Sequence, residues 1–108
     1  MRVLFICRYN RRRSATAERI FDKDPSLEVR SAGTSEDALV RVSQRMLDWA
    51  EIVFTMDDEQ RLDLSGMFPG HAALNRIVCL DIRDRYDFLD PELVALLRER
   101  AGPHLRRA

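Results

Sequence analysis

The stretch FICRYNRRRSATAE, residues 5–18, sets out the architecture expected for the whole chain. An apolar run over 3–6 ends at Cys7, and a short polar loop then leads into an amphipathic stretch over 14–22. A continuously apolar run is typical of a strand covered on both faces, and the apolar spacing after the loop is helical. The stretch therefore predicts a strand, a tight loop and a helix, with a thiol where the strand ends.

The rest of the chain repeats this alternation. We expect further strands over 27–31, 52–56 and 77–80, and helices over 43–50, 57–67 and 91–101. Asp90 before Pro91 is a helix start, and Gly102-Pro103 is a helix stop. Alternating strands and helices predict a small doubly wound α/β fold. We expect a single domain, residues 1–108, with a four-stranded parallel sheet in the order 2-1-3-4 and helices on both faces.

Composition excludes several classes of protein. The 108 residues carry 18 basic and 18 acidic side chains, so global charge favours neither nucleic acid nor an anionic membrane as a partner. No apolar stretch approaches the ~20 residues of a membrane span. Cys7 and Cys79 are too few for a disulfide framework, which indicates a reducing cytoplasm. We expect Cys79, inside RIVCL, to pack in the core, and we expect no metal or other cofactor.

The loop after Cys7 has the chemistry of an anion site. Backbone N–H groups and the positive end of a helix dipole converge where a strand gives way to a helix. A thiolate, which is the nucleophilic form of cysteine, is stabilised in such a field. Arg13 can hold two phosphoryl oxygens at once, and the Ser14 hydroxyl can donate to the thiolate. Asn10 tolerates a left-handed backbone and can brace the loop.

The spacing Cys7-x5-Arg13-Ser14 is typical of cysteine-dependent phosphatases, and the wider sequence resembles the low-molecular-weight protein tyrosine phosphatase family. The resemblance covers most of the chain. It rests on Cys7, Asn10, Arg13, Ser14, Ala17 and Glu18, on SAGT at 31–34, on WAEIVFTMD at 49–57 and on DIRDRY at 81–86.

This resemblance implies a phosphomonoesterase that hydrolyses phosphotyrosine or a small aryl phosphate through a phosphocysteine intermediate. Cys7 would be the nucleophile, Arg13 the catalytic arginine and Asp84 the general acid, with Asp81 and Asp87 as alternatives. Tyr86 would line the substrate cleft. The remaining phosphate-binding residues would be Arg8, Tyr9, Asn10, Arg11, Arg12 and Ser14.

Four departures from the family pattern stand out. Tyr9 replaces a glycine, Arg85 replaces a proline, and the chain is shorter than typical members. Arg12 replaces the family's second cysteine, which in the family traps an oxidised nucleophile as a disulfide.

Other functions remain open at this point. The same loop would suit a non-catalytic module that binds phosphate or a nucleic-acid 5′ end, and Arg8, Arg11 and Arg12 would then face the polynucleotide. An arsenate-reductase-like enzyme needs two further cysteines, of which only Cys79 is present. Phosphoserine also remains open as a substrate.

Overall fold

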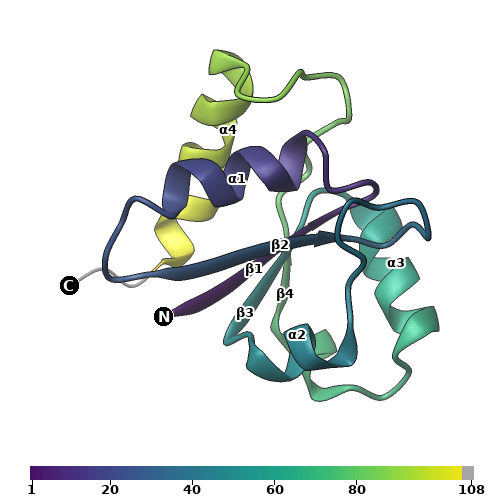
Figure 1. Ribbon diagram of the computed structural model, residues 1–108. Coiled ribbons are helices and arrows are strands. Elements are labelled where there is room, and N and C mark those ends of the chain that lie inside the picture. Colours follow the sequence, from purple (N-terminus) through teal and green to yellow (C-terminus); the bar gives the residue numbers. More distant parts are fainter. Residues whose placement is uncertain (106–108) are drawn as a thin grey trace.

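The computed structural model describes residues 1–105, which form a parallel sheet with helices on both faces (Figure 1). The strand order is β2-β1-β3-β4, as predicted. The strands are β1 (Arg2–Cys7), β2 (Glu28–Gly33), β3 (Ile52–Thr55) and β4 (Ile77–Cys79). The α-helices are α1 (Arg13–Phe21), α2 (Gln44–Trp49), α3 (Asp58–Met67) and α4 (Pro91–Ala101). Two 3₁₀ helices, η1 (Ala72–Arg76) and η2 (Gly102–His104), complete the described elements.

Strand β1 lies at the centre of the fold and pairs with both β2 and β3. The side chains of residues 3–6 are completely buried because α1 and α4 cover one face of the sheet, and α2 and α3 cover the other (Figure 1). Alternate residues of β1 face opposite layers. Phe5 stacks between Phe21 of α1 and Phe54 of β3, with ring centroids 5.5 and 5.1 Å away. The apolar run of the sequence is thus a strand sandwiched by two cores.

Helix starts follow the local chemistry of the sequence. Ser43, Asp57 and Asp90 precede α2, α3 and α4, and each side chain accepts a hydrogen bond from a backbone N–H of the first helical turn. Such caps satisfy donors that a helix leaves unpaired at its start. The predicted ends of these helices are therefore correct to within one or two residues.

One expectation about the region around β4 is corrected. Cys79 is exposed and does not pack in the core, because β4 is a three-residue strand at the edge of the sheet. The segment before β4 contains η1, and the His71 ring accepts a hydrogen bond from the Ala73 amide at the start of η1. In the part of the chain that the structure describes, no helix is long and apolar enough to cross a membrane.

Candidate active site

Cys7 ends the central strand, at the carboxyl edge of the sheet where ligands bind in open α/β folds. It pairs with Gly33 of β2, and only 3% of its surface is exposed. Residues 8–12 then form the loop that connects β1 to the first turn of α1. The thiol therefore lies beneath the N-terminus of a helix, as the sequence predicted.

Two polar groups contact the Cys7 sulfur. The Asn10 amide donates to Sγ over 3.1 Å, and the Ser14 Oγ lies 2.9 Å from the same atom. The loop can turn its amides inward because Asn10 adopts a left-handed conformation, with φ of 58°. Tyr9, which replaces the family's glycine, does not adopt a positive φ, so its side chain costs the loop no backbone strain.

The Asn10 side chain fixes this loop from within. Its Nδ2 donates to Ser14 Oγ over 2.8 Å and to Ser31 Oγ over 2.9 Å. Ser31 in turn donates to the Glu18 carboxylate. The network joins the loop, α1 and β2, so that Asn10, Ser14 and Glu18 of the matched motif act as one hydrogen-bonded unit.

The segment that follows β2 supports the loop from outside. The backbone amides of Thr34, Ser35 and Leu39 donate to the carbonyls of Cys7, Arg8 and Tyr9, respectively. Such close approach requires Gly33, because a Cβ at that position would lie 2.5 Å from the Arg8 carbonyl oxygen. The glycine of SAGT is thus needed for the loop geometry.

Arg13 is almost fully buried, with 2% of its surface exposed, and its guanidinium is held by groups from two other segments. Its NH1 donates to Asp57 Oδ2 over 2.9 Å and to the Ile82 carbonyl over 2.8 Å. Its Nε has no hydrogen-bond partner among the described residues, and it lies 3.7 Å from Asp84 Oδ1. One edge of the guanidinium is therefore anchored, and the other lies by the pocket.

Asp57 is the site residue that sequence analysis missed. In the sequence it is only the first residue of the helix expected over 57–67 and the last residue of the stretch 49–57. It does cap α3, because its Oδ1 accepts from the Glu59 amide. The other oxygen holds Arg13, which lies 44 residues earlier in the chain. The only sequence signal for this contact was the Met-Asp pair that ends the third strand. The start of the following helix at Asp57 already accounted for that aspartate.

Asp84 is presented by a loop with two buried anchors. Ile82 and Tyr86 pack into the core on the α1 and α4 side of the sheet, and the residues between them remain at the surface. The Asp84 side chain is 45% exposed and lines the same pocket as Cys7. Asp81 lines a different hollow, and Asp87 lines neither of these cavities. Among the three candidate acids, Asp84 is the one that lines the same pocket as Cys7.

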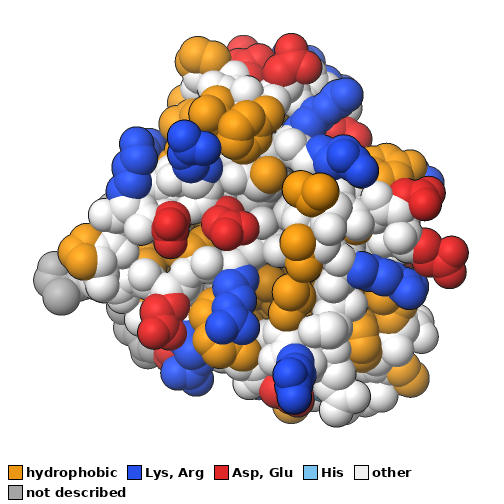
Figure 2. Space-filling model, viewed as in Figure 1, with side chains coloured by type: hydrophobic (Ala, Val, Ile, Leu, Met, Phe, Trp, Pro, Cys, Tyr) orange, Lys and Arg blue, Asp and Glu red, His pale blue; other side chains and the backbone are white. Residues whose placement is uncertain are grey.

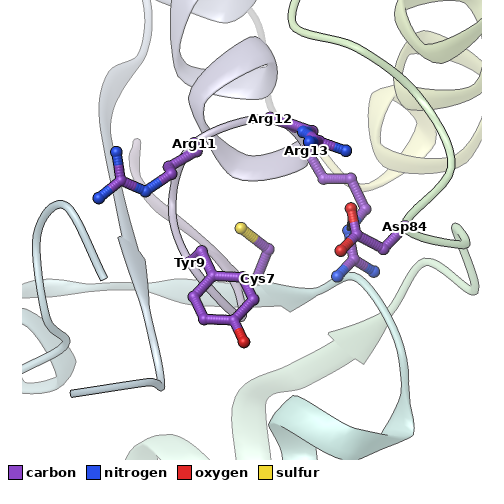
Figure 3. A pocket seen from close by; sticks show the side chains of 6 residues that line it. All are labelled: Cys7, Tyr9, Arg11, Arg12, Arg13 and Asp84. Carbon is purple, nitrogen blue, oxygen red and sulfur yellow. Dashed lines mark ion pairs between the residues drawn. The ribbon is translucent and has the colours of Figure 1, made fainter. Parts of the chain in front are cut away.

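The pocket has a volume of about 160 Å³, and its lining residues are Cys7, Tyr9, Arg11, Arg12, Arg13 and Asp84 (Figure 3). Four residues predicted to bind substrate, Arg8, Asn10, Ser14 and Tyr86, lie outside this lining. Asn10 and Ser14 instead contact the Cys7 sulfur. Arg8 pairs with Glu59 at 3.5 Å, and the Tyr86 ring is buried as an anchor of its loop. Among residues 1–105, no group of three or more His, Cys, Asp or Glu side chains is placed to hold a metal ion.

No protein-family model matches the sequence, and no curated protein matches it. Solved structures do match. The tyrosine phosphatase Wzb from Escherichia coli K30, in complex with phosphate, has a TM-score of 0.78 at 19% identity, over 95% of this chain and 94% of that one. The chain has the fold of the low-molecular-weight protein tyrosine phosphatases.

Two further structures with this fold are similar over most of their length. A YwlE mutant from Bacillus subtilis has a TM-score of 0.72 at 20% identity, over 96% of this chain and 98% of that one. The low-molecular-weight protein tyrosine phosphatase SP-PTP from Streptococcus pyogenes has a TM-score of 0.74 at 17% identity, over 96% and 90%. The fold resemblance read from the loop motif is therefore confirmed across the whole sheet.

Proposed function

We propose that the protein is a cysteine-dependent phosphomonoesterase of the protein tyrosine phosphatase type. The observation that carries the proposal is the surroundings of the Cys7 sulfur. A backbone amide and a hydroxyl contact it, and a buried arginine and a carboxyl group line the same pocket. These are a nucleophile, a phosphoryl-binding group and a proton donor within one small cavity.

In the first step, the Cys7 thiolate attacks phosphorus and an S–P bond forms while the bond to the leaving oxygen breaks. Arg13 and the loop amides hold the phosphoryl oxygens, on which negative charge is spread during the transfer. Protonated Asp84 gives its proton to the leaving alkoxide or phenoxide. The products of this step are the free alcohol and a phosphocysteine.

In the second step, water attacks the phosphocysteine. The Asp84 carboxylate now acts as the base and takes a proton from the water, which restores the acid. The S–P bond breaks, inorganic phosphate leaves, and the thiolate returns to its contacts with Ser14 and Asn10. Ser14 assists here because its hydroxyl stabilises the departing sulfur anion.

The solved structures support this chemistry without fixing the substrate. One neighbour is described as a YwlE arginine phosphatase, a C7S mutant with a phosphorylated active-site serine, and another as a tyrosine phosphatase bound to phosphate. We carry over the covalent intermediate from the first and the binding of phosphate from the second. We propose phosphorylated protein or a small aryl phosphate as the substrate, and the reducing cytoplasm as the place of action.

The test is turnover of para-nitrophenyl phosphate by the wild-type protein, by Cys7→Ser and by Cys79→Ser. We expect vanadate-sensitive hydrolysis in the wild type, none in Cys7→Ser, and an undiminished rate in Cys79→Ser because that exposed thiol lies outside the pocket. Binding of phosphate without turnover would instead identify a non-catalytic phosphate-binding module. An unaltered rate in Cys7→Ser would remove the thiol from the chemistry.

A further inference from the structure

Two of the arginines that line the pocket have no counter-charge among residues 1–105. Arg11 and Arg12 are exposed, and neither forms an ion pair or a side-chain hydrogen bond with any residue in the described part of the chain. Other arginines near the site are neutralised: Arg8 by Glu59, and Arg13 by Asp57 and Asp84. The mouth of the pocket therefore carries two unpaired positive charges.

These two side chains do not point at the sulfur. In Figure 3, Arg11 and Arg12 extend from the loop in opposite directions, and the Cys7 sulfur lies inside the curve of the loop. A phosphoryl group seated on the sulfur would be held by the loop amides and by Arg13. The charges of Arg11 and Arg12 then lie on either side of that group, where they would meet the neighbouring parts of a substrate.

We propose that Arg11 and Arg12 are specificity residues for an acidic polypeptide segment, in which the phosphorylated residue has Asp or Glu on both sides. This inference rests on the proposed function for the position of the phosphoryl group. Opposite charges across a contact surface favour one class of partner and disfavour a like-charged one. A substrate with basic flanks would meet both arginines with repulsion.

The surroundings favour polypeptide over nucleic acid. Apolar side chains are exposed beside the mouth, where the Leu39 amide donates to the Tyr9 carbonyl, and Tyr9, Leu39 and Val40 are 37%, 65% and 42% exposed. A polynucleotide would need a continuous track of cations for its backbone. Figure 2 shows basic and acidic side chains interspersed on the face in view rather than gathered into such a track.

The experiment compares three ligands of matched length. Each is at least five amino acids or nucleotides long and carries one phosphate. One is a phosphotyrosine peptide with Asp and Glu flanks, one has the isosteric Asn and Gln in their place, and one is a 5′-phosphorylated oligonucleotide. Dissociation constants are measured on Cys7→Ser, so that binding is read independently of turnover. Turnover of the same ligands by the wild type is measured in parallel.

We expect the acidic peptide to bind about five- to tenfold more tightly than the amide peptide at low salt, since two exposed ion pairs contribute modestly. Adding Arg11→Gln or Arg12→Gln to Cys7→Ser should each lower that ratio two- to threefold. Adding Arg61→Gln, which removes an exposed arginine on α3 away from the pocket, should leave the ratio unchanged. In Cys7→Ser without an arginine substitution, raising the salt concentration should reduce the ratio of the affinities for the acidic and the amide peptide. This comparison needs no folding control because the protein is the same in each measurement.

Equal affinity for the two peptides would overturn the inference. So would tighter binding of the oligonucleotide, which would indicate a nucleic-acid end as the ligand. Absence of turnover alongside a preserved preference for the acidic peptide would overturn the proposed phosphatase function and leave this inference standing. The two failures are therefore distinguishable in one set of measurements.

Discussion

Replacing Asp57 by asparagine removes one charge and changes little else. The side chain keeps its shape, and an amide oxygen can still accept from the Glu59 amide at the start of α3. What is lost is the carboxylate that holds Arg13 NH1 at 2.9 Å. The substitution therefore separates the cap of α3 from the positioning of the buried guanidinium.

The expected loss of stability follows from the burial of the two partners. Breaking a fully buried ion pair costs about 3–5 kcal/mol, and an exposed pair contributes less than about 1 kcal/mol. Here the Arg13 side chain is 3% exposed and the Asp57 side chain 33% exposed, so the cost should lie between the two. We expect about 2 kcal/mol, or a fall in Tm of about 8–12 °C for a chain of this length.

Activity should fall as well, because Arg13 loses the contact that fixes its orientation. Misplacement of a positioning group by about 1 Å can cost about a hundredfold, so we expect kcat/KM on para-nitrophenyl phosphate to drop about ten- to a hundredfold. Saturating phosphate should recover part of the lost Tm, since the bound dianion gives the buried cation a new partner.

Asp58→Asn is the matched control, because that neighbouring carboxylate is exposed and, among the described residues, forms its ion pair with Arg61. Differential scanning calorimetry with and without phosphate, together with steady-state kinetics, measures all the quantities. The reasoning would be refuted if Asp57→Asn melted and turned over substrate like Asp58→Asn.

Three further predictions concern the same site. Asp84→Asn should lower kcat about a hundredfold on phenyl phosphate but far less on para-nitrophenyl phosphate, whose leaving group needs no proton; an equal loss from Asp81→Asn would remove Asp84 from the role. Gly33→Ala should lower Tm by several degrees, because the new Cβ would meet the Arg8 carbonyl oxygen at 2.5 Å, and a Tm as high as that of the wild type would contradict the close approach. Ser14→Ala should lower kcat about tenfold with little change in KM, and a change in KM alone in steady-state assays would assign Ser14 to binding.

The sequence was most informative where local chemistry alone determines structure. The apolar run before Cys7, the helix start at Asp90 and the left-handed Asn10 each depend on a few neighbouring residues, and the structure agrees with all of them. The strand order followed because alternating strands and helices restrict the possible connections.

Sequence analysis failed where the outcome depended on distant partners. Cys79 belongs to an apolar run like the one before Cys7, and only the position of β4 at the sheet edge exposes it. Asp57 already had a local explanation, so its contact with Arg13 left no trace in the pattern. Tyr86 is aromatic, as expected of a residue that lines the cleft. Its side chain is buried, however, in the core on the α1 and α4 side of the sheet.

The replacement of the family's second cysteine by Arg12 also affects how the Cys7 sulfur responds to peroxide. Cys79 pairs with Thr55, and Thr55 pairs with Ile6, so the two cysteines sit two strands apart, about 10 Å at normal strand spacing. A disulfide needs Cα atoms within about 7 Å, so no second thiol of the same chain can reach a sulfenic acid at Cys7. Continued exposure to oxidant would then carry that sulfur to the sulfinic state, which thiol reductants do not reverse.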